Sequence, residues 1–115
     1  MTQRIDLSHE ELRGLTVEGA RDLVVRCFLE AQKETFERAA SKLGTAPSDD
    51  RLRSIVEGAV RLAFRATHGD FNLPTRDALM LAVERLATQA AAMGTPPDII
   101  EHHRSQLGRV FAAIS

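Results

Sequence analysis

Histidine has the widest chemical scope of any side chain here near neutral pH, because its pKa lies close to physiological values. His103 interrupts an otherwise apolar helical stripe, so its imidazole is expected to face the interior. The apolar members of that stripe are Ile100, Leu107, Val110 and Ile114. A buried imidazole can act as a general base or hold a ligand. The interpretation we favour is a structural histidine, hydrogen-bonded to a neighbouring helix, for example to Gln32.

Glu101 and His102 precede His103 directly, so Gln32, Glu101, His102 and His103 are the candidate ligand-binding residues. A di-iron bundle needs a Glu-x-x-His pair on each of two helices and two further glutamates. The third residue after Glu101 is Arg104, and no HExxH pair of a metalloprotease occurs. We therefore predict no metal site, no cofactor and no catalytic set.

A basic cluster occupies the segment 49–68, and its members are Arg51, Arg53, Arg61 and Arg65. Glu57 lies at helical spacing from two of them, which favours an ordinary salt-bridged helix face over a surface for phosphate-rich or acidic partners. The formal net charge of −1 and the absence of Trp and Tyr also make nucleic-acid binding an unfavoured interpretation.

Cys27 is the single cysteine, so no intrachain disulfide can form and a reducing compartment is expected. Its place in the middle of a predicted helix indicates a buried, inert thiol. The chain has neither a signal-peptide-like start nor an apolar run of the roughly 20 residues that span a bilayer. These features predict a cytoplasmic protein that does not enter membranes.

Helix start and stop signals predict four main helices, over about 17–43, 49–68, 76–93 and 96–114, and a short one within 8–14. Thr16, Ser48 and Thr75 are the expected N-caps. The expected buried positions of the second helix are Leu52, Ile55, Val56, Ala59, Ala63 and Ala66. Those of the third are Leu79, Ala82, Val83, Leu86, Ala90 and Met93. No segment alternates with the period of a strand.

Short connections between these helices make sequential neighbours antiparallel. The predicted fold is therefore an all-α, up-down-up-down four-helix bundle that forms a single domain over residues 1–115. Residues 1–15 are expected to pack as an extension on the bundle or on a second copy of the chain. Gly58 and Gly108 lie within predicted helices, where a missing side chain suits a tight helix crossing.

The helix predicted over 17–43 would be roughly 40 Å long, against roughly 28 Å for the others. Its segment 23–29 is apolar on nearly all sides and must be covered on most of them. We therefore expect a homodimer, with Val17, Val24, Val25 and Phe28 as candidate interface residues. The predicted function is non-enzymatic, through self-association and binding of a protein partner. The alternative is a small enzyme or ligand-binding bundle that uses a polar pocket around His103.

Overall fold

The computed structural model describes residues 7–43 and 48–114, apart from the side chains of residues 39–43. It contains five helices in this part of the chain and no strand. The helices are α1 (His9–Leu12), α2 (Val17–Leu43), α3 (Asp49–Ala66), α4 (Arg76–Ala92) and α5 (Pro97–Ala113). The prediction of an all-α bundle with a short N-terminal helix is confirmed.

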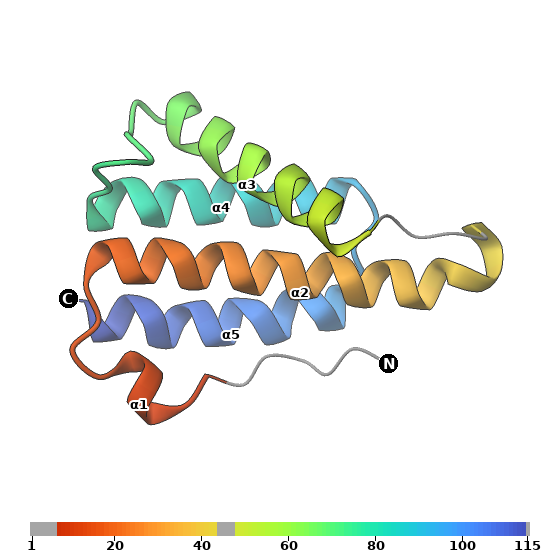
Figure 1. The fold of residues 1–115 in the computed structure, drawn as a ribbon, viewed down its shortest axis with the longest axis horizontal. Helices are drawn as coiled ribbons and strands as arrows, with labels where there is room; N and C mark the ends of the chain where they lie inside the picture. Colours follow the sequence, from red (N-terminus) through yellow and green to blue (C-terminus); the bar gives the residue numbers. More distant parts are fainter. Residues whose placement is uncertain (1–6, 44–47, 115) are drawn as a thin grey trace.

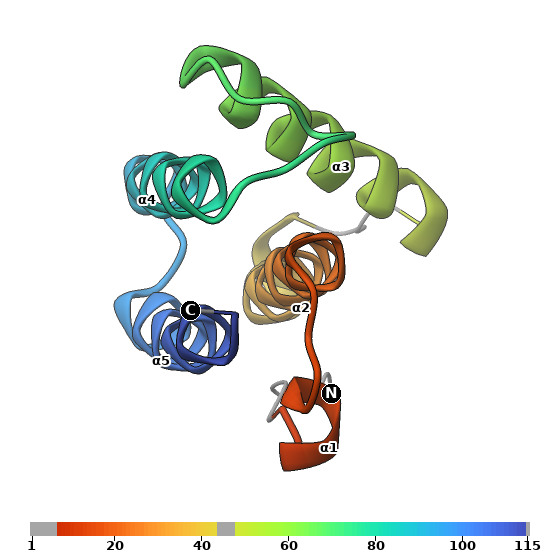
Figure 2. The same cartoon turned by 90° about the vertical axis from the view of Figure 1, so that its left-hand side faces the viewer.

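The four long helices alternate in direction along the chain, as the colours in Figure 1 show. Helix α2 packs against α3, α4 and α5, whereas α3 packs only against α2 and α4 among the described helices. Figure 2 shows α3 lying obliquely across α2 and α4, with α1 below the α2–α5 pair. Helix α2 also runs past the ends of α4 and α5 (Figure 1). The predicted up-down-up-down order is present, with α3 inclined.

Three of the long helices are N-capped by side-chain hydroxyl groups. The hydroxyl of Thr16 accepts from Gly19 N at 3.0 Å, that of Ser48 from Arg51 N at 3.3 Å, and that of Thr75 from Ala78 N at 3.2 Å. Each bond satisfies one of the free N–H groups of a helix N-terminus. In α1, Ser8 and Glu11 form a reciprocal capping box.

The core surrounds the N-terminal half of α2. Val24 and Cys27 of α2 are fully buried, as are Val60 and Phe64 of α3, Leu79 of α4, and Ile99 and Val110 of α5. Leu7 is 2% exposed, and its N–H donates to Gln106 Oε1 of α5 at 3.0 Å. Leu12 and Leu15 are partly buried and pack against the same core. The chain itself thus covers the apolar segment of α2. Residues 1–6 of the predicted extension lie outside the described residues.

The two glycines expected at tight helix crossings lie in open space instead. A Cβ atom at Gly58 or Gly108 would meet no atom within 4 Å, so neither marks a close contact between helices of this chain. The close approach occurs at Gly69, in the connection between α3 and α4. A Cβ there would lie 2.9 Å from Ala78 Cβ and 3.1 Å from Phe64 Cδ1. The Gly69 N–H donates to Phe64 O at 2.7 Å, which holds this connection against α3.

Candidate functional site

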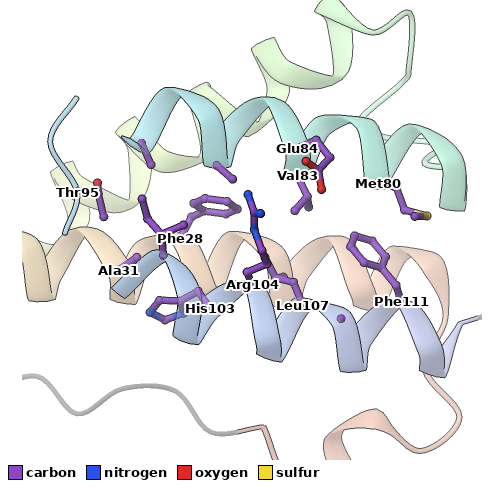
Figure 3. Close-up of a pocket in the computed structure, with 14 residues that line it drawn as sticks. Phe28, Ala31, Met80, Val83, Glu84, Thr95, His103, Arg104, Leu107 and Phe111 are labelled. Atoms are coloured by element: carbon purple, nitrogen blue, oxygen red, sulfur yellow. The ribbon is translucent and has the colours of Figure 1, made fainter. Parts of the chain in front are cut away.

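A cavity of about 170 Å³ lies between α2, α4 and α5. Its walls are mainly apolar, and Figure 3 shows the rings of Phe28 and Phe111 on its sides. Polar groups enter from His103 and Arg104 of α5 and from Glu84 of α4. The other lining residues are Ala31, Met80, Val83, Ala87, Ala90, Thr95, Ile100, Leu107 and Gly108. A concave, partly open and mainly apolar space with a few polar groups is the usual form of a small-molecule site.

His103 is 4% exposed and forms part of the wall of this cavity. Its ring packs edge-to-face against that of His102, with the centroids 5.3 Å apart and the planes at 81°. Gln32 lines a different groove, and Glu101 is exposed on the surface of α5. The charged groups that share the cavity with His103 are therefore Arg104 and Glu84, which the sequence analysis did not select. Helix spacing could have indicated Arg104, whereas the position of Glu84 depends on how α4 packs.

A second apolar groove, of about 200 Å³, separates α3 from α2 and α4. Phe28 and Ala90 line both spaces, so this part of α2 and α4 forms a shared wall. At the edge of the groove Ile55 is 53% exposed and Met93 is 87% exposed. Both were expected to be buried, and that prediction is wrong, as it is for the exposed Ala66. The remaining lining residues are Gln32, Phe36, Leu52, Val56, Ala59, Val60, Leu86 and Gln89.

The four candidate interface residues of α2 lie in or near the interior of their own chain. Val24 is fully buried and Val25 is 9% exposed, while Val17 and Phe28 are half-buried. The surface apolar residues that the sequence analysis did not single out lie elsewhere. Leu62 of α3 is 64% exposed and Leu81 of α4 is 54% exposed. The excess of apolar side chains on α2 is therefore accommodated by α3, α5 and the segment that contains Leu7.

The four arginines of the basic cluster are all exposed on α3. Arg53 and Arg61 line a groove of about 360 Å³ between α2 and α3. The other lining residues are the charged Asp22, Arg26 and Glu57 and the apolar Leu23, Val25 and Phe71. Arg51 and Arg65 do not line it. The guanidinium of Arg61 lies 4.2 Å from the centre of the Phe71 ring, a cation–π contact. Acidic and basic residues alternate in this groove, as on an ordinary solvated helix face.

Arg21 of α2 contacts Phe71, and the sequence analysis did not predict this contact. Its guanidinium lies 4.8 Å from the Phe71 ring centre, and its Nη1 donates to Phe71 O at 2.8 Å. The Phe71 ring in turn meets Phe64 edge-to-face, with the centroids 5.8 Å apart. The connection between α3 and α4 is thus anchored on α2 and on the core. The sequence around Arg21 does not indicate this contact, because its partner Phe71 is a loop residue 50 positions away.

Cys27 is fully buried, and its burial raises the pKa of the thiol to about 12. The reactive species of cysteine is the thiolate, so this side chain is not suited to nucleophilic chemistry at neutral pH.

Across the described ranges, no group of three His, Cys, Asp or Glu side chains is placed to hold a metal ion. None of the helices in the described part of the chain combines the length and apolar character that crossing a bilayer requires. Comparison with protein families, with curated proteins and with solved structures finds no match to this chain.

Proposed function

We propose that the protein is a non-enzymatic, cytoplasmic helical bundle that acts through self-association, and that α3 supplies the contact surface. The observation that carries this proposal is an apolar stripe on the outer flank of α3. Ile55 and Leu62 lie one heptad apart on the same face of the helix and are 53% and 64% exposed. Large apolar side chains left exposed in a row indicate a contact site more than isolated ones do.

The stripe has the spacing of a helix-packing surface. Ile55, Ala59, Leu62 and Ala66 follow one another at i, i+4, i+7 and i+11, over a length of about 17 Å. Ala59 and Ile55 also line the groove that ends at the exposed Met93 of α4. A partner helix packed along the stripe would remove these side chains from water.

A second copy of the chain, paired antiparallel through α3, is the occupant we propose for this stripe. Helix α3 has Asp49 and Asp50 in its first turn and Arg65 in its last turn. An antiparallel pair places Asp49 and Asp50 of each helix beside Arg65 of the other. Arg51 and Arg53 offset part of the acidic charge at that end, and Asp49 also pairs with Lys33 of α2 at 3.7 Å. Gly58 lies near the midpoint of the stripe, and a Cβ there would meet no atom within 4 Å. Two backbones can therefore approach closely near the symmetry axis of such a pair.

Sedimentation velocity over a concentration series tests this proposal, with native mass spectrometry as a second measurement. We expect a dimer for the unaltered chain, and monomers for Ile55→Lys and Leu62→Lys, because each places a charge in an apolar contact. Leu81→Lys is the matched control, since Leu81 is 54% exposed on α4 outside the stripe, and it should leave the dimer intact. A monomer at every concentration, or a dimer that survives both α3 substitutions, would contradict the proposal.

A further inference from the structure

We propose that the cavity between α2, α4 and α5 binds a small molecule made of one apolar ring and a single carboxylate. This site is separate from the α3 stripe and does not depend on self-association. Three features of the cavity support this assignment: its size, an unfilled position in its wall, and the charges at its mouth.

The size of the cavity fits one ring. It measures about 170 Å³, and an apolar cavity of about 150 Å³ in another protein stays dry and binds benzene. Phe28 of α2 and Phe111 of α5 project into the lining (Figure 3). Aromatic side chains in such positions favour edge-to-face or offset contacts with a ring.

Gly108 leaves part of the wall unfilled. Glycine inside a helix weakens it relative to alanine, so its presence at the middle of α5 calls for a reason. A Cβ at this position would meet no atom within 4 Å, so close packing within the chain is not that reason. Gly108 lines the cavity, and the missing side chain keeps that side open to a bound molecule.

The charges at the mouth favour a monoanion. The Arg104 side chain extends from α5 toward α4 (Figure 3) and forms no ion pair with any described residue. A guanidinium can bind a carboxylate through two parallel hydrogen bonds. Glu84 is the other charged lining residue from the described part of the chain, and its repulsion increases with the negative charge of the ligand, so it disfavours a doubly charged phosphate more than a carboxylate. His103 also lines the cavity, on its α5 side and away from Glu84 (Figure 3).

Binding is tested by NMR titration of the full chain with three probes that share a ring. They are 3-phenylpropionate, which carries a carboxylate, 3-phenylpropanol, which is neutral, and 2-phenylethylamine, which is a cation. We expect 3-phenylpropionate to bind most tightly, to shift the His103 ring resonances, and to give intermolecular NOEs to Phe111 and Leu107. The NOEs locate the ring in the unaltered protein and so do not depend on any variant folding.

Three variants then separate the parts of the site. Arg104→Gln should weaken 3-phenylpropionate about tenfold and leave 3-phenylpropanol unchanged, as expected for loss of one charge-assisted contact. Gly108→Leu should abolish binding of both probes, because its side chain enters the cavity; circular dichroism checks that it stays helical. Arg85→Gln is the matched control, since Arg85 is exposed on α4 next to Glu84 but does not line the cavity. It should change neither affinity.

Three results would overturn the proposal. The first is that no probe produces NOEs to Phe111 or Leu107. The second is that 2-phenylethylamine binds as tightly as 3-phenylpropionate, which would exclude Arg104 as the recognition group. The third is that Gly108→Leu, shown to be folded, binds the probes like the unaltered chain.

Discussion

Helix α5 and helix α3 both pack against α2, but they are held in different ways. Specific polar contacts tie the α5 side to α2 and to the N-terminal segment. Arg38 of α2 donates to both carboxylate oxygens of Asp98 at 2.9 and 2.7 Å, and Leu7 N–H donates to Gln106 Oε1. On α3, an apolar face does most of the packing, with one ion pair to α2 from Lys33 Nζ to Asp49 Oδ2 at 3.7 Å. The Phe64–Phe71 contact joins α3 to the next connection.

This difference determines which surface remains open. The α2–α5 side is closed by the segment before α1, whose Leu7 is buried against it. Nothing in the described part of the chain covers the outer flank of α3, where Ile55 and Leu62 stay exposed. Polar contacts fix the register of two helices because their geometry is demanding. The centre of an apolar face can be buried while the apolar side chains at its edge stay exposed to solvent, and this is the case for α3.

The largest expected loss of stability comes from removing an apolar side chain by which α3 packs on the core. Phe64→Ala should lower the free energy of unfolding by about 3–5 kcal/mol, because it empties a fully buried site. Urea denaturation at a concentration below association measures it. Leu62→Ala, on the exposed flank of the same helix, should change stability by less than about 0.5 kcal/mol. A similar loss for both would mean that the flank is packed within the monomer.

A smaller effect is expected on the α2–α5 side. Gln106→Ala should cost about 1–3 kcal/mol, because it leaves the buried N–H of Leu7 without its acceptor. Hydrogen exchange should report faster exchange of the Leu7 amide, alongside urea denaturation. The control is Gln89→Ala on the exposed face of α4. If the two variants lose the same stability and the Leu7 amide is unaffected, the polar contact does not secure the segment before α1.

The smallest expected change is a gain in the stability of the monomer. Gly58→Ala should stabilise the monomer by up to about 1 kcal/mol, because alanine favours a helix and its Cβ meets open space. Gly69→Ala should destabilise it, since the new Cβ would lie 2.9 Å from Ala78 Cβ. Thermal unfolding of the two variants at high dilution compares them directly. A loss of stability in Gly58→Ala would show that the outer flank of α3 is packed after all.

Local features of the sequence predicted the start of each long helix to within one residue and its end to within two, since α3 ends at Ala66 and α4 at Ala92. Ser48 and Thr75 cap α3 and α4, and Gly94, which takes a φ of +96°, follows the end of α4. These signals act within a few residues and need no knowledge of the fold.

The choice of which apolar side chains become buried could not be predicted in the same way. Ile55 and Val56 are adjacent and equally apolar, yet one is 53% exposed and the other 4%. The outcome depends on the inclination of α3 across α2 and α4. The cavity likewise requires three helices, so Glu84 of α4 could not be placed beside Arg104 from helix periodicity.

The contact between Leu7 and Gln106 has a consequence for the order of folding. It joins residues 99 positions apart, which is nearly the length of the chain. Contacts within and between consecutive helices close short loops, whereas this one must close almost the whole polypeptide and bears the largest entropy of loop closure. We therefore expect it to form after the main folding barrier. Weakening it should accelerate unfolding and leave the folding rate nearly unchanged. The segment before α1 would then dock late in folding, onto a bundle whose helices have already packed.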